Sequence, residues 1–244
     1  MNLRATLRLA DAAALLLAGL FTVVLAYPFC SSARRLALKQ GWSRRLLRAL
    51  GIELRVSGTM PPQGLIVANH ISFIDIFAIN AAAPSAFVSK DEVRRWPLIG
   101  FLAARTDTIF LERGSRNAAQ RAREHLIDEL RNGTRVALFP EGTTSRGASV
   151  LPFHAALLQS AIDAEATVTP VTLRYLDGNG CRTEAAAYVD DMSLLDCLRA
   201  IATADRILAE VRVLPGIATS GVDRRHLAAH AHRAIAHALA AAPE

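Results

Sequence analysis

The chain has 244 residues with a formal net charge of +6, and 52% of its residues are hydrophobic. This length suits one sizeable α/β domain with an appendage, and a mean hydropathy of +0.25 is high for a purely soluble protein. The three cysteines form no C-x-x-C pair, which argues against a disulfide scaffold and against a zinc site. The positive charge suits nucleic acid, an anionic membrane surface or acidic substrates.

The N-terminal segment is apolar between residues 12 and 30 and basic on both sides. The uncharged run is nearly as long as the ~20 residues that a helix needs to cross a bilayer. Arg4 and Arg8 precede the run and more basic residues follow it, so the positive-inside rule places the rest of the chain in the cytoplasm. A signal peptide is the rival interpretation, but Pro28 and Phe29 stand where its cleavage site would fall. A buried core helix is a further alternative.

Residues 33–52 have the pattern of a basic amphipathic helix, with Trp42, Leu47 and Leu50 on its apolar side. We therefore expect residues 1–50 to form a membrane anchor, either a single span or a hairpin that lies in one leaflet. Because much of the positive charge flanks this anchor and no aromatic platform alternates with it, nucleic acid is excluded as a partner.

After the anchor, strand-like and helix-like segments alternate. The expected strands are 64–69, 85–90, 107–112, 134–140 and 166–175, with weaker candidates at 185–191 and 206–214. The expected helices begin near Phe73 and then cover 91–105, 115–133, 153–165 and 223–241. This alternation predicts an α/β fold with a largely parallel sheet flanked by helices, preceded by the anchoring helical segment.

Polar side chains follow several of the expected strands. In parallel sheets, functional sites form beyond the carboxyl ends of the strands. The residues in question are Asn69, His70 and Asp75 after the first strand, Glu112 and Arg113 at the third, and 140–147 after the fourth. We expect these segments to converge at one edge of the sheet.

His70 and Asp75 have the spacing of a general-base pair. The four residues between them let the chain turn back, so that the carboxylate reaches one imidazole nitrogen. Such a carboxylate fixes the tautomer and supports the imidazolium that forms when the other nitrogen takes a proton. Because the sequence has no G-x-S-x-G elbow, the base would act directly on an acceptor alcohol. Taken alone, the spacing favours a helix-capping aspartate beside a hydrogen-bonded histidine.

The segment FPEGTTSRG, residues 139–147, offers a tight turn with backbone N–H groups and the hydroxyls of Thr143, Thr144 and Ser145. A loop of this kind can hold an anion, although an ordinary turn is the alternative. Arg113, which closes TIFLER, can supply a cation for a phosphate or carboxylate. Its alternative is a solvated charge at a strand end.

Five ordered segments between residues 42 and 176 resemble the glycerolipid acyltransferase family, whose central members are 1-acyl-glycerol-3-phosphate acyltransferases. They are NHISFID, FVSKDEVRRWPLIG, TIFLER, FPEGTTS and VTPVTLRY. The resemblance implies that His70 takes the proton from the hydroxyl of the acceptor, with Asp75 as its partner. The hydroxyl attacks an acyl thioester, carried by acyl carrier protein or coenzyme A, and no cofactor or metal is bound.

The resemblance also implies a binding site for the acceptor's polar head. The expected substrate-binding residues are Asn69, Arg113, Glu141, Gly142, Thr143, Thr144 and Arg146. Residues 51–244 would form the catalytic domain with its C-terminal helix, on the cytoplasmic side of the inner membrane. The expected activity is membrane-bound O-acylation of a lysolipid, with 1-acyl-glycerol-3-phosphate as the first choice of acceptor and phosphatidic acid as the product.

One residue departs from the family pattern, because Thr144 stands where Glu-Gly-Thr-Arg-Ser has arginine. A phosphate that loses this guanidinium loses a charge-assisted contact of roughly 1.5–3 kcal/mol. Arg146 would substitute for it, or the acceptor is a lyso-ornithine lipid, whose head carries no phosphate. A non-catalytic lipid-binding module is the alternative of another class, against which the intact His70 and Asp75 argue.

Two further helices carry open interpretations. The expected helix 91–105 combines Arg94 and Arg95 with apolar residues, and it fits the lipid surface and the protein core equally well. In the last helix, His226 and His230 have a spacing that can bind a metal. Because no acidic or cysteine partner accompanies them, we expect no metal there.

Overall fold

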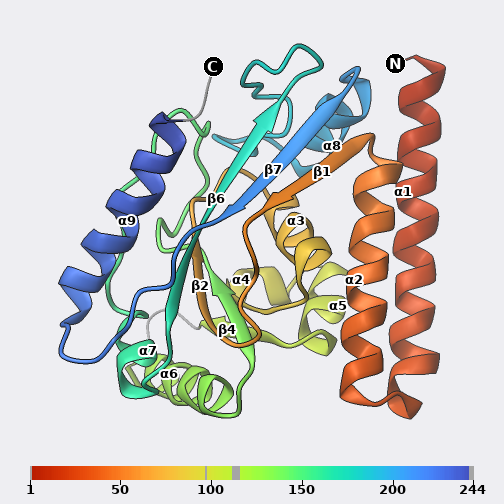
Figure 1. Ribbon diagram of the computed structural model, residues 1–244. Coiled ribbons are helices and arrows are strands. Elements are labelled where there is room, and N and C mark those ends of the chain that lie inside the picture. Colours follow the sequence, from red (N-terminus) through yellow and green to blue (C-terminus); the bar gives the residue numbers. More distant parts are fainter. Residues whose placement is uncertain (1, 97, 112–115, 242–244) are drawn as a thin grey trace.

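The computed structural model describes residues 2–96, 98–111 and 116–241, and the side chains of these apart from 116–119. Within them, one seven-stranded sheet has the order β1-β7-β6-β2-β5-β3-β4 (Figure 1). The strands are β1 (Ile52–Ser57), β2 (Gly64–Ala68), β3 (Ala86–Lys90), β4 (Thr108–Leu111), β5 (Arg135–Leu138), β6 (Val168–Leu176) and β7 (Ile207–Val213). Neighbouring strands are parallel except β6 and β7, which confirms the predicted α/β fold with its largely parallel sheet.

Helices cover both faces of this sheet. They are α1 (Leu3–Phe21), α2 (Ser32–Ala49), α3 (Ile74–Ala82), α4 (Asp91–Arg94), α5 (Ile99–Arg105), α6 (Arg116–Arg131), α7 (Gln159–Asp163), α8 (Leu194–Thr203) and α9 (Arg224–Ala240). Apolar residues of α2, α3 and α8 form the core on one face, and those of α6, α7 and α9 form it on the other. The central strand β2 is buried along its whole length, because its side chains alternate between these two apolar layers.

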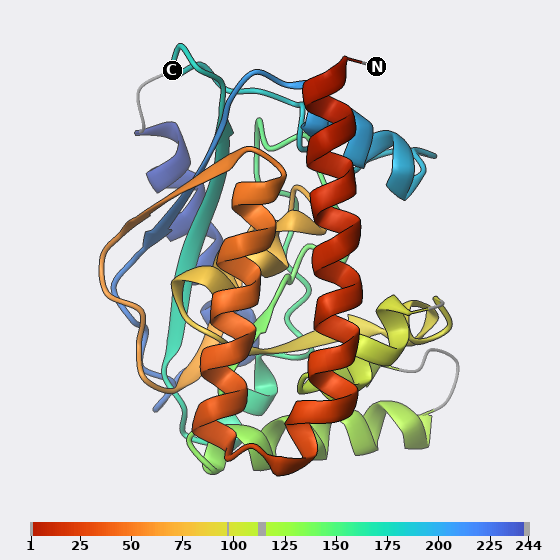
Figure 2. The ribbon, with the colours of Figure 1, turned by 90° about the vertical axis from the view of Figure 1, so that its right-hand side faces the viewer.

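The first two helices form an antiparallel hairpin that lies along the body (Figures 1 and 2). A π-helical turn, Thr22–Ala26, and a 3-10 turn, Tyr27–Phe29, connect them. Trp42 Nε1 donates a hydrogen bond to the carbonyl of Leu15 at 2.7 Å, and a Cβ at Gly19 would lie 2.7 Å from the same nitrogen. The helices approach this closely because position 19 has no side chain.

The N-terminal end of α1 is tied to the body. Arg8 donates hydrogen bonds to the carbonyls of Ala202, in the last turn of α8, and of Ala204 and Asp205, after α8. Arg4 pairs with the Asp205 carboxylate. The segment Leu3–Phe29 is long and apolar enough to cross a membrane, with a mean hydropathy of 2.2, yet only 11% of its most apolar stretch of 18 residues is buried. The expected apolar N-terminal segment is therefore present, packed as a hairpin with few of its apolar residues buried.

Several expected elements differ from the structure. The strand β1 and the helix α8 were not predicted from the sequence. Residues 185–191, a weak strand candidate, form turns and irregular backbone instead. The expected helix 153–165 shrinks to α7, because the His154 N–H donates to the carbonyl of Pro140 and so holds the preceding segment in a loop. The expected helix 91–105 is interrupted between α4 and α5. Leu98 has a φ of +66° there, and the sequence has a proline directly before Leu98.

Candidate active site

The structure brings His70 and Asp75 together at the carboxyl end of β2. His70 lies in the loop that follows this strand, and Asp75 lies in the first turn of α3. His70 Nδ1 is 2.9 Å from Asp75 Oδ2. The carboxylate is fully buried, whereas the His70 side chain is 18% exposed. An acceptor on Nδ1 assigns the proton to that nitrogen and leaves the lone pair of Nε2 free to accept another.

Asp75 is held by donors on both of its oxygens. The backbone N–H groups of Ile71 and Ser72 donate to Oδ2 at 2.7 and 2.9 Å. The hydroxyl of Tyr175, in β6, donates to Oδ1 at 2.6 Å. Hydrogen bonds of this kind stabilise the ionised carboxylate despite its burial. Tyr175 was not predicted as a site residue from the sequence. There it appears only as a tyrosine near the end of a buried strand.

The His70 ring also has a fixed plane. It stacks on Phe139, which directly follows β5, with ring centroids 3.9 Å apart and an interplanar angle of 8°. Phe139 in turn contacts Phe87 of β3. This role of Phe139 was not predicted from the sequence, although Phe139 is the first residue of the FPEGTTSRG segment. The pair of contacts, Asp75 on the ring edge and Phe139 on its face, leaves the imidazole a single orientation.

The turn after β5 forms hydrogen bonds with the backbone of His70. Glu141 is buried, and its Oε1 and Oε2 accept hydrogen bonds from the backbone N–H groups of His70 and Leu151 at 2.9 and 3.2 Å. The N–H of Ser145 donates to the His70 carbonyl at 2.8 Å. Burial, with a smaller contribution from the charge of Asp75, raises the pKa of Glu141 to about 7. Both carboxylate oxygens of Glu141, an expected substrate-binding residue, thus contact backbone groups of the protein.

Two other expected binding residues are also engaged within the protein. Asn69 is buried, and its side-chain amide both donates to and accepts from the backbone of Leu173 at 3.0 and 2.8 Å. These two bonds join the end of β2 to β6. The hydroxyl of Thr144 donates to the carbonyl of Tyr188. Both side chains thus hold neighbouring segments together in the structure.

The remaining expected residues have contrasting positions. Arg146 pairs with the carboxylates of Glu184 and Asp190 at 2.8 and 2.6 Å. Gly142 and Thr143 are exposed, and Gly142 has a φ of +69°, a conformation that favours glycine. Arg113 lies outside the described residues.

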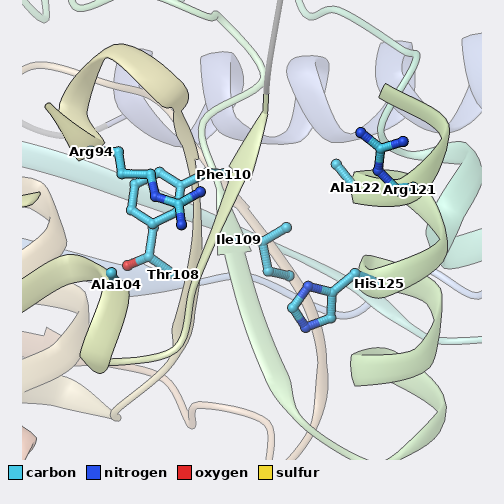
Figure 3. A pocket seen from close by; sticks show the side chains of 8 residues that line it. All are labelled: Arg94, Ala104, Thr108, Ile109, Phe110, Arg121, Ala122 and His125. Carbon is cyan, nitrogen blue, oxygen red and sulfur yellow. The ribbon is translucent and has the colours of Figure 1, made fainter. Parts of the chain in front are cut away.

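Two open hollows on the described part of the surface lie at other places. One, of about 330 Å³, lies beside β4 between α5 and α6, with Arg94, Arg121 and His125 among its lining residues (Figure 3). The other, of about 340 Å³, lies beside α9 and is lined by Phe153 and His232 among others. Neither lining includes His70 or Asp75. The histidine–carboxylate pair therefore lies apart from both hollows.

The described part of the chain contains no group of three or more His, Cys, Asp or Glu residues that could hold a metal ion. His226 instead contacts Asp223, the residue that caps α9.

On the segment 91–105, Trp96 is 38% exposed and Phe101 is 39% exposed. These aromatic side chains lie at the surface of the protein and not in its core.

His70, held by the buried carboxylate of Asp75 at the carboxyl end of a central strand, has the geometry of an oriented general base. The family model described as Acyltransferase matches residues 53–174. The chain belongs to this family, and the protein is an acyltransferase of lipid metabolism, which confirms the resemblance seen in its sequence.

Two bacterial relatives show the same membership in more detail. The chain is 39% identical over 206 residues to lyso-ornithine lipid O-acyltransferase of Pseudomonas aeruginosa, covering 84% of this chain and 79% of that protein. It is 40% identical over 185 residues to 1-acyl-sn-glycerol-3-phosphate acyltransferase of Neisseria meningitidis serogroup B, covering 75% and 72%. The crystal structure of the 1-acyl-sn-glycerophosphate acyltransferase from Thermotoga maritima shares the fold, with a TM-score of 0.70, 21% identity and coverage of 97% and 99%.

Proposed function

We propose that the protein transfers a fatty acyl group from an acyl thioester to the free hydroxyl of a lysolipid. The observation that carries this proposal is the geometry of His70, whose Nδ1 is held by the buried Asp75 while the ring remains partly exposed. A histidine in this arrangement is an oriented general base. A non-catalytic lipid-binding module, the alternative of another class, has no use for a base held in this way.

The reaction follows from the free lone pair of Nε2. This nitrogen accepts the proton of the acceptor hydroxyl while the hydroxyl oxygen attacks the thioester carbonyl. Asp75 stabilises the imidazolium that forms. The tetrahedral intermediate then collapses, the carbon–sulfur bond breaks, and the leaving thiolate takes the proton from Nε2. The products are the O-acylated lipid and a free thiol, and His70 regains its neutral state.

Transfer proceeds directly, without an acyl-enzyme. Cys197 contacts the carbonyls of Ala186 and Ala187 and is fully buried, and burial raises the pKa of its thiol to about 11. A thiol with a raised pKa is a poor nucleophile at neutral pH. The donor is the thioester of acyl carrier protein or of coenzyme A, used as a co-substrate and not as a bound cofactor.

The acceptor that the geometry favours is a lyso-ornithine lipid. Thr144 uses its hydroxyl on Tyr188, and Arg146 is already neutralised by Glu184 and Asp190. Neither residue offers a free cation for the phosphate of 1-acyl-glycerol-3-phosphate, so the expected replacement of the missing arginine by Arg146 finds no support. The head of a lyso-ornithine lipid is an amino acid and has no phosphate to be neutralised.

The second candidate acceptor is 1-acyl-glycerol-3-phosphate, the first choice from the sequence. The Neisseria relative, named for that acceptor, supports it. Arg113 is the residue that would carry the phosphate contact. Acylation of this acceptor would give phosphatidic acid for phospholipid biosynthesis.

We also propose that the enzyme lies on the cytoplasmic face of the inner membrane, with α1 in the plane of one leaflet. The start of α1 is tied to the segment after α8 by Arg4 and Arg8, and its end returns to the body through α2. A helix with both ends on one body does not cross the bilayer. Its exposed apolar side chains, among them Leu17, Phe21 and Leu25, would enter the lipid.

The test is acyl transfer by membranes that contain the protein. Labelled acyl carrier protein thioester or acyl coenzyme A is supplied with either lyso-ornithine lipid or 1-acyl-glycerol-3-phosphate, and membranes with the His70→Ala variant serve as the control. Product above the control with either acceptor supports the proposed activity. The absence of product with both acceptors and both donors would refute it, and a preference for the phosphate acceptor would overturn the choice of lyso-ornithine lipid.

A further inference from the structure

We propose that Tyr175 is a positioning residue that holds the second carboxylate oxygen of Asp75 and, through Asp75, helps to orient the base His70. This inference rests on the proposed function. It assigns to the protein a third member of the hydrogen-bonded chain that runs from β6 through α3 to the loop after β2. Tyr175 itself touches neither substrate nor the reacting atoms.

The donors around Asp75 are unequally divided between its oxygens. Oδ2 takes the bonds from the Ile71 and Ser72 backbone and from His70 Nδ1. Oδ1 takes one bond from within the described residues, the 2.6 Å bond from the Tyr175 hydroxyl. The bond on Oδ1 adds a restraint on the rotation of the carboxylate about its Cβ–Cγ bond, and this restraint comes from β6. Tyr175 therefore contributes to the orientation of Oδ2 toward the imidazole.

The surroundings of Tyr175 give its hydroxyl no other task. The side chain is 2% exposed and packs in the apolar core between the sheet and the helices α2, α3 and α8, near Cys197 and Ile201. A phenylalanine would fill the same space with the same ring. The hydroxyl is thus the one feature of Tyr175 that the packing does not require, and Asp75 is its acceptor.

The hydroxyl acts as a permanent donor. Burial and the neighbouring charge of Asp75 raise the pKa of Tyr175 well above its usual value, so the phenol keeps its proton. The bond shares part of the negative charge of Asp75 with Tyr175. Without it, more of the charge lies on Oδ2, and rotation of the carboxylate about the Cβ–Cγ bond loses one restraint. The hydrogen bond from His70 Nδ1 then becomes stronger, and its direction is less well fixed.

A graded substitution of this one hydroxyl tests the inference. Tyr175→Phe removes the donor, and site-specific replacement of Tyr175 by 3,5-difluorotyrosine keeps the hydroxyl and makes it a stronger donor. Tyr27→Phe is the matched control, because it removes the hydroxyl of another buried tyrosine, which donates to the carbonyl of Arg35 in the N-terminal hairpin. All measurements use the full chain in detergent micelles or vesicles.

The kinetic readout separates kcat from KM. We expect Tyr175→Phe to lower kcat about 10-fold, a fraction of the ~10²–10⁴-fold contribution of a general base, with the KM values for donor and acceptor unchanged. The difluorotyrosine protein and Tyr27→Phe should retain kcat values close to that of the parent. A Tyr175→Phe protein that is folded and has the parent's kcat would overturn the inference.

The second readout does not depend on activity. The proton on His70 Nδ1 gives a downfield NMR resonance, which is assigned by its loss in His70→Ala. We expect this resonance to move further downfield in Tyr175→Phe and upfield with 3,5-difluorotyrosine, and to stay unchanged in Tyr27→Phe. Unchanged resonances in both Tyr175 proteins would refute the role of Tyr175.

The two readouts keep the inference apart from the proposed function. If the parent protein acylates no lysolipid, the proposed function fails, while the resonances still decide whether Tyr175 controls the His70–Asp75 pair. If Tyr175→Phe does not fold, the difluorotyrosine protein decides alone, because its hydroxyl and ring remain. An unshifted resonance in that protein would overturn the inference.

Discussion

The backbone N–H of His70 donates a hydrogen bond to Oε1 of Glu141 at 2.9 Å. A buried carboxylate from the turn after β5 thus holds the residue that follows β2, and its other oxygen holds Leu151. The position of the candidate base therefore depends on a side chain that does not contact its ring. The chemistry of the imidazole and the placement of its backbone thus depend on different residues. Substitutions of these residues should therefore have different effects.

The imidazole and its carboxylate partner should both be needed for acyl transfer. We expect His70→Ala and Asp75→Asn to lower kcat by roughly 10²-fold or more, because the first removes the base and the second removes the charge that stabilises the imidazolium. Initial rates with labelled donor measure the effect. As a control, His232→Ala changes a histidine that lies in α9 and contacts Val150 and Phe153. Parent-like rates in folded His70→Ala would contradict the mechanism.

The raised pKa of Glu141 predicts a pH dependence of stability. Its value of about 7 in the folded protein exceeds the ~4.3 of an unfolded chain. Between these values the folded state binds more protons than the unfolded state, so the contribution of Glu141 to the free energy of unfolding falls as pH rises from about 4.3 to 7. The loss is on the order of 2–3 kcal/mol.

Glu141→Gln isolates this contribution, because it cannot titrate. The free energy of unfolding, measured with urea at pH 5 and pH 7.5, should fall more steeply with pH in the parent than in Glu141→Gln. Groups elsewhere in the chain titrate in both proteins and cancel in the comparison. Parallel dependences in the two proteins would show that the carboxyl does not titrate in this range.

Substitution of Asn69 distinguishes a structural residue from a binding residue. Asn69→Ala leaves the buried N–H and C=O of Leu173 without partners, and each unmet group costs about 1–3 kcal/mol. We expect a loss of roughly 2–5 kcal/mol in the free energy of unfolding, with the KM for the acceptor unchanged in the protein that remains folded. An increase in that KM without a loss of stability would instead support the expected role of Asn69 in binding.

The apolar face of α1 should carry membrane attachment. Phe21 is 61% exposed and Leu17 is 52% exposed, so Leu17→Asp and Phe21→Asp leave the packing of the hairpin largely intact. Each change places a charge where apolar surface would enter the lipid, and we expect binding to anionic vesicles to weaken about 10-fold or more. Vesicle sedimentation measures the bound fraction.

The matched control for this experiment is Leu195→Asp. Leu195 is 49% exposed, but it lies on α8 and not in the apolar N-terminal segment. This variant should bind vesicles like the parent. If all three variants bind equally well, α1 is not the membrane-contacting element.

The extent of what the sequence reveals differs between the sheet and the site. The apolar runs that form β2 and most of β5 were recognisable because strands buried on both faces carry apolar residues throughout. In contrast, β1 is buried only at Ile52 and follows closely on α2, so its pattern merged with the preceding helix. The loop at 153–158 depends on a bond from His154 to Pro140, which has no local signature.

By itself, the amino-acid sequence determined the α/β class, the apolar N-terminal helix and the proximity of His70 to Asp75. These features depend on residues that are close in the chain, through periodicity and short spacings. Only the tertiary structure decided that Tyr175 donates to Asp75 from 100 residues away, and that Arg146 is neutralised by Glu184 and Asp190. The physical reason is the order of the strands, because β6 lies beside β2 only in the assembled sheet, and no local pattern encodes which distant side chains then meet.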